Sequence, residues 1–125
     1  MTEQEFKRRT KDVALRIIRM TASFPNTWAA EIIGKQIIRC GTSVGANYRA
    51  ACRGKSTADV LHKLAIVEEE VDECLYWMEL LIEADIFPER LLLPLMQEVD
   101  EILAMTVASI KTIRSRTTSN PKSRI

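Results

Sequence analysis

Histidine, glycine and proline are scarce in this chain. Four glycines and four prolines among 125 residues are too few for the frequent tight turns of an all-β fold. The single histidine, His62, cannot complete a zinc site, because the three cysteines include no CxxC pair. An odd number of widely spaced cysteines is typical of reduced, buried thiols. We therefore expect neither a disulfide framework nor a metal site.

Long apolar runs are also missing. No segment approaches the roughly 18 apolar residues that a membrane-spanning helix needs. The opening sequence, MTEQEFKRRTKD, is too polar for a signal peptide. We therefore expect a cytoplasmic protein with no membrane partner.

Apolar residues recur every three or four positions through most of the chain. This periodicity is typical of amphipathic helices. The predicted helices cover about residues 3–23, 27–53, 56–84 and 89–115. Short connections and the absence of a longer internal repeat predict one domain, residues 1–115, with an all-α, antiparallel up-down-up-down four-helix bundle. The basic, unpatterned tail, 116–125, is predicted to be disordered. The predicted core stripe of the fourth helix is Leu92, Met96, Val99, Leu103, Thr106, Ile110 and Ile113.

Three glycines are placed where they predict local structure. Gly41 and Gly45 lie inside the second helix, where glycine costs about 1 kcal/mol relative to alanine. Close approach of a neighbouring helix would offset that cost. Gly54 predicts a left-handed residue at the end of the second helix. Ser56 and Asp59, three residues apart, predict a capping box that opens the third.

Charge is distributed unevenly along the chain. Residues 1–55 contain eleven Lys/Arg and four Asp/Glu, whereas residues 56–103 contain two and thirteen. Arg guanidinium groups match phosphate oxygens, so the basic part predicts a nucleic-acid-binding surface on the first two helices. The alternative is a structural or protein-interaction scaffold, in which these cations pair with the acidic third helix and direct assembly. The candidate nucleic-acid contacts are Arg8, Arg9, Arg16, Arg19, Lys35, Arg39, Arg49, Arg53 and Lys55.

Aromatic and apolar residues are densest near the end of the third helix, at residues 74–82. Tyr76, Trp77 and Leu80 fall outside its main apolar stripe. A helix that is apolar on more than one face is covered on more than one face. These three residues, with Tyr48 of the second helix, are therefore the candidate oligomer interface.

Two short motifs match catalytic or metal sites only in part. The GKS at 54–56 matches the end of a phosphate-binding loop, but that motif needs a preceding strand and a glycine where the chain has Arg49. Asp59 and His62 have the carboxylate–histidine spacing of di-iron bundles, which require a second such pair. One histidine without an elbow motif supports no catalytic triad. We therefore expect no enzyme, no catalytic residues and no cofactor.

Three sequence blocks occur in order and at helical spacing: SVGANYRAA at 43–51, KS at 55–56 and EEVDECLYWMELL at 69–81. Together they resemble the bacterial 23S rRNA intervening-sequence proteins, also called the four-helix-bundle protein family, over roughly residues 6–113. The resemblance implies a bundle that assembles as a homopentamer and has no accepted catalytic residues. Related accessory proteins of diversity-generating retroelements are similar pentamers that bind nucleic acid and associate with a reverse transcriptase. The partners implied are further copies of the chain, RNA or DNA, and a reverse transcriptase.

Overall fold

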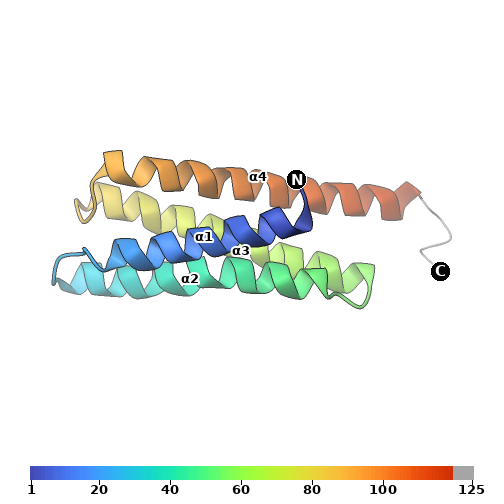
Figure 1. Ribbon diagram of the computed structural model, residues 1–125, viewed down its shortest axis with the longest axis horizontal. Helices are drawn as coiled ribbons and strands as arrows, with labels where there is room; N and C mark the ends of the chain where they lie inside the picture. Colours follow the sequence, from blue (N-terminus) through green and yellow to red (C-terminus); the bar gives the residue numbers. More distant parts are fainter. Residues whose placement is uncertain (120–125) are drawn as a thin grey trace.

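Four helices make up the structure, a computed structural model that describes residues 1–119 (Figure 1). The helices are α1 (Glu3–Thr21), α2 (Trp28–Cys52), α3 (Thr57–Glu83) and α4 (Glu89–Ser119). Each runs antiparallel to the one before it, and of the four neighbouring helix pairs α2 and α3 share the most extensive contact, α1 and α4 the least. The predicted all-α four-helix bundle is therefore confirmed. None of the helices in the described part of the chain combines the length and hydropathy that a membrane span requires.

Side-chain caps determine where the helices begin. The Thr27 hydroxyl accepts a hydrogen bond from the Ala30 N–H at 3.2 Å, and the Ser56 hydroxyl accepts one from the Asp59 N–H at 3.1 Å. The Asp59 carboxylate in turn accepts the Lys55 N–H at 3.1 Å. These bonds satisfy amide groups that have no partner inside their own helix. The predicted capping box is thus present, with its return bond made one residue earlier than the standard motif.

The end of α2 differs from the prediction. Gly54 is not left-handed, and among residues 1–119 the only positive φ, 57°, belongs to Asp85 in the α3–α4 connection. Glycine is needed at position 54 for space, since a Cβ there would overlap Val60 Cγ2 and lie 3.1 Å from the Ala51 carbonyl oxygen. The missing side chain lets the α2–α3 connection fold tightly against the first turn of α3.

The glycines inside α2 do allow a close helix approach. A Cβ on Gly41 would lie 2.5 Å from Ile17 Cδ1, and one on Gly45 would lie 3.3 Å from Thr10 Oγ1. Both neighbours belong to α1, so the side chains of α1 pack directly on the backbone of α2. The predicted reason for these two residues is confirmed.

One apolar seam runs through the bundle, and in α1, α2 and α3 its buried residues recur every three or four positions, as the periodicity of the sequence predicted. In α4 the stripe is rotated. Leu95 and Ile102 are buried, whereas the predicted Met96 and Leu103 are half-buried beside the seam. All four of these residues are apolar, so the periodicity of the sequence could not show which pair is buried. Leu95 and Ile102 are buried because α4 packs mainly on α3. The buried stripe of α4 is Leu92, Leu95, Val99, Ile102, Thr106 and Ile110.

α4 continues to Ser119, past the predicted end at residue 115. The predicted disordered tail, 116–125, therefore begins inside a helix, and residues 120–125 lie outside the described part of the chain. Figure 1 shows the last turns of α4 projecting beyond the ends of the other helices.

Candidate nucleic-acid interface

Arg9 belongs to a salt bridge between α1 and α4. Its Nε lies 2.8 Å from Glu98 Oε2 and its Nη2 also bonds Glu98, a two-pronged geometry that suits guanidinium and carboxylate. Glu101 Oε1 is 3.5 Å away. The hydrogen bonds between the two partners raise the pKa of Arg9 and lower the pKa of Glu98. Arg9 therefore joins two helices that touch little elsewhere.

Arg39 is paired across the α2–α3 seam. Its guanidinium bonds Glu73 and lies 3.4 Å from Glu70, both in the carboxylate run of α3. Glu73 also accepts the indole N–H of Trp77 at 2.9 Å. Gln36 Oε1 accepts Arg39 Nε at 3.1 Å. For this arginine the expected pairing with the acidic third helix is observed.

Two further candidates make only local pairs. Arg16 lies 3.8 Å from Asp12 and Lys35 lies 3.2 Å from Glu31, each four residues apart on one helix. Such exposed pairs contribute about 0.3–0.5 kcal/mol and are screened by salt. They do not prevent either cation from meeting another anion.

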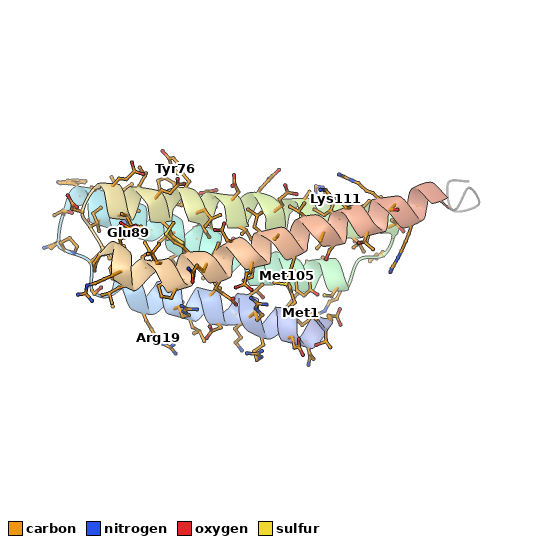
Figure 2. All side chains as sticks on the ribbon, turned by 90° about the horizontal axis from the view of Figure 1, so that it is seen from above. Met1, Arg19, Tyr76, Glu89, Met105 and Lys111 are labelled. Atoms are coloured by element: carbon orange, nitrogen blue, oxygen red, sulfur yellow. The ribbon has the colours of Figure 1, made fainter. Side chains whose placement is uncertain are left out.

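The other five predicted contacts are exposed cations that make no ion pair within residues 1–119. They are not gathered at one place. Figure 2 shows Arg19 at the same end of the bundle as Glu89, whereas Met1 marks the opposite end of α1. The five are Arg8, Arg19, Arg49, Arg53 and Lys55.

A groove between α1 and α2 brings unpaired cations together. Two adjoining cavities, of 220 Å³ and 430 Å³, share Lys7, Lys11 and Arg49 in their walls. We call these three side chains and the space between them the cationic groove. Gly45 and Ala46 of α2 line the smaller cavity. None of the three cations makes an ion pair within the described residues, although all three lie within helices.

Lys7 and Lys11 were not among the predicted contacts. The sequence does contain a signal for them, because Lys7, Lys11 and Ala14 follow one face of a helix at i, i+4 and i+7. That face lies against the small residues of α2. Recognising it required knowing which side of α1 meets α2.

The candidate oligomer residues lie on two different helix contacts. Tyr48 packs on Phe6 at the α1–α2 contact, with ring centroids 4.3 Å apart, and burial raises the pKa of its phenol. Tyr76 and Trp77 meet edge to face on α3 at 5.1 Å, and Figure 2 shows Tyr76 projecting from the bundle. Leu80 is half-buried against the core. Tyr48 is therefore engaged within the subunit, whereas Tyr76 is open.

Two exposed apolar residues at the start of α2 were missed. Trp28 is 84% exposed and Ile32, one turn later, is 53% exposed. Both lie outside the α2 core stripe. Exposed apolar residues on successive turns of a helix form a patch, and such patches mark interaction sites. The spacing of Trp28 and Ile32 was the available signal.

Within residues 1–119 no cluster of histidine, cysteine or carboxylate side chains could hold a metal ion. Cys40 and Cys74 are buried free thiols with their sulfur atoms 3.2 Å apart. The hydrogen bond between them and their burial raise the pKa of Cys74. Neutral, fully enclosed thiols fill the core and are poor nucleophiles.

Comparison with known proteins identifies a family and a structural neighbour. The family model described as 23S rRNA-intervening sequence protein matches residues 2–108. A crystal structure of a protein with unknown function from the S23 ribosomal protein family of Bacteroides thetaiotaomicron is 32% identical, with a TM-score of 0.82. The match covers 89% of this chain and 99% of that chain. No curated protein sequence matches.

Proposed function

The chain belongs to the 23S rRNA-intervening sequence protein family, and we propose that it is a non-enzymatic, oligomeric bundle that binds nucleic acid. The family resemblance predicted from the three sequence blocks is confirmed by the match over residues 2–108. The descriptions of the family and of the structural neighbour both refer to the ribosome or its RNA. A cytoplasmic location and a reverse transcriptase as partner remain predictions, the second carried by the resemblance alone.

The observation that carries the proposal is the unequal pairing of the basic residues. Carboxylates of α3 and α4 neutralise Arg39 and Arg9, yet leave the cations of the α1–α2 contact without partners. Unpaired cations gathered on one surface raise the local concentration of polyanions and release counterions when phosphates replace them. The near-neutral net charge of +1 therefore conceals a positive surface beside a neutralised one.

Binding of a labelled single-stranded RNA of about 20 nucleotides tests the proposal. We expect the logarithm of affinity to fall linearly with the logarithm of salt concentration, by about 0.7 for each phosphate contacted. An uncharged backbone analogue of the same base sequence is the control and should not bind. Absence of RNA binding at about 50 mM salt, where counterion release favours association strongly, would contradict the proposal.

A second function, as an assembly scaffold, is favoured by the exposed apolar side chains of α2 and α3. Trp28, Ile32 and Tyr76 are each more than half exposed. We propose that they, with Trp77 and Leu80, form the contact between copies in the homopentamer that the resemblance implies. The two functions are compatible, because the cationic groove lies on the α1–α2 contact and none of these five apolar residues lines it.

Light scattering tests the assembly. Wild-type protein should have a mass several times the 14.2 kDa of one chain, and Trp28→Asp should reduce it, because a charge in a desolvated contact lacks a partner. Leu91→Asp on α4, where Leu91 is 53% exposed, is the matched control and should leave the mass unchanged. A wild-type mass near that of one chain would contradict the scaffold.

A further inference from the structure

We infer that the cationic groove binds the phosphodiester backbone of a nucleic acid without reading its base sequence. The inference rests on the proposed nucleic-acid function and deepens it, by assigning one site and one mode of recognition. It follows from three features of the groove: the charges on its walls, the shape of its floor, and the side chains that it lacks.

The walls are positive on both sides. Lys7 and Lys11 come from α1 and Arg49 comes from α2, so a negatively charged chain lying along the groove would be flanked by cations from both helices. Arg8 adds a fourth cation to the lining of the larger cavity, and Glu5 is the one carboxylate among the described lining residues. Lys and Arg neutralise phosphates and release their condensed counterions.

The floor is made of small residues. Because Gly45 has no side chain, Thr10 of α1 packs closely on α2: a Cβ at position 45 would lie 3.3 Å from Thr10 Oγ1. Ala46 is exposed and presents only a methyl group. The two cavities share three residues and therefore form one continuous depression along the helix contact. An open groove along a helix contact accommodates an extended polymer, whereas a small molecule binds best in a concave pocket that encloses it.

Among the described lining residues, the side chains suited to a base edge are Gln4 and the two arginines, Arg8 and Arg49. None of the described lining residues is aromatic, whereas sequence-tolerant and sequence-specific single-strand binders both stack bases on aromatic rings. The hydroxyl groups of Thr10 and Thr42 donate to carbonyl groups of their own helices, at 3.0 Å to Phe6 and 2.8 Å to Ile38. Contacts from such a groove reach phosphates, which position a nucleic acid but do not identify its sequence.

A matched pair of double variants tests the site. Lys11→Ala with Arg49→Ala removes one cation from each wall of the groove. Arg19→Ala with Lys35→Ala removes the same charge from the same two helices, and neither of these residues lines the groove. Because the change in net charge is identical, a difference between the two double variants reports position alone. Circular dichroism and thermal unfolding verify that both variants fold, and Lys11→Gln with Arg49→Gln is the milder replacement should the alanine variant not.

We expect the groove variant to bind the RNA of about 20 nucleotides at least about tenfold more weakly at 100 mM salt, and to lower the salt slope by about 1.4, the value for two lost single-strand contacts. The Arg19/Lys35 variant should stay within about twofold of wild type. RNAs of equal length and different base sequence should bind wild type equally.

The outcomes separate the two proposals. If wild-type protein binds RNA but both double variants lose affinity equally, or the Arg19/Lys35 variant loses more, the groove is not the site, and the proposed function survives without it. A preference of more than about tenfold among base sequences would overturn backbone-only recognition. If wild-type protein binds no RNA, the proposed function and the inference both fail.

Discussion

At the end of the bundle that contains the α1–α2 and α3–α4 connections, all four helices bury apolar side chains, among them Met20, Ile33, Leu81 and Leu92. At the opposite end, where α1 begins and α4 finishes, Phe6 of α1 still belongs to the apolar seam, and a second, smaller buried cluster consists of Ala51, Leu64 and Ile110 with no residue of α1 among the described residues. We call these the loop end and the terminus end.

Ion pairing differs along α2 as well. Lys35 at the loop end is paired with Glu31, whereas Arg49, nearer the terminus end on the same helix, makes no ion pair within residues 1–119. Apolar burial is the main favourable contribution to folding. The loop end therefore accounts for much of the stability, and Arg49 can remain unpaired nearer the terminus end because less of the fold depends on that end.

The largest expected effect tests the unequal cores. Met78→Ala removes a fully buried side chain from the main seam and should cost about 3–5 kcal/mol, whereas Ile110→Ala in the small cluster should cost about 2 kcal/mol. The difference arises because a thinly covered site collapses more easily around the lost volume. Urea unfolding measures both free energies, with the exposed Leu91→Ala as a control expected within about 0.5 kcal/mol of wild type. Equal costs for Met78 and Ile110 would mean that the core is equally strong at both ends.

A smaller effect tests the polar tie between α1 and α4. Glu98→Gln removes the nearer of the two carboxylates on the Arg9 guanidinium, whose side chain is 18% exposed, leaves Glu101 at 3.5 Å, and should cost about 1–2 kcal/mol at pH 7. Glu31→Gln, which breaks the exposed pair with Lys35, should cost at most about 0.5 kcal/mol. If the two substitutions cost the same, Arg9 and Glu98 contribute no more than a surface pair.

The Glu98 effect should also depend on pH. Its pKa in the folded protein lies below the ordinary 4.5, because of the hydrogen bonds from Arg9. The unfolded chain therefore binds a proton first as the pH falls, and stability present above pH 4.5 is lost as the pH drops through the folded value. The difference in unfolding free energy between wild type and Glu98→Gln should therefore shrink as the pH falls below 4.5 and vanish below the folded pKa of Glu98. A difference that is constant from neutral to acidic pH would show that Glu98 acts by packing alone.

Periodicity in the sequence predicted the fold well and the site only in part. Spacing along one helix specifies which residues are buried, so four helices and most of the seam followed from it. Ion pairing depends on residues far apart in the chain, such as Arg39 with Glu73 and Arg9 with Glu98, and no local pattern reveals which helix faces meet. The candidate surface was therefore too broad, and it omitted Lys7 at the contact where α1 meets α2.

The smallest expected effect concerns two cations on α2 and differs in sign between them. Arg49→Gln should stabilise the protein by about 0.2–0.5 kcal/mol at low salt, because it relieves repulsion from the lysines that share its groove. Lys35→Gln should destabilise it by about 0.3–0.5 kcal/mol, because it loses the carboxylate 3.2 Å away. Gln has a helix propensity close to that of Arg and Lys, so propensity cancels from the comparison.

Urea unfolding at low salt and at about 1 M salt separates these signs, since screening at the higher concentration should bring both variants close to wild type. A destabilising Arg49→Gln would show that Arg49 has a structural role, either through an intramolecular partner or through the negative C-terminal end of α2, in whose last turn it lies. A stabilising one would mean that the fold retains a cation against its own stability, as expected of a residue kept for an external anion.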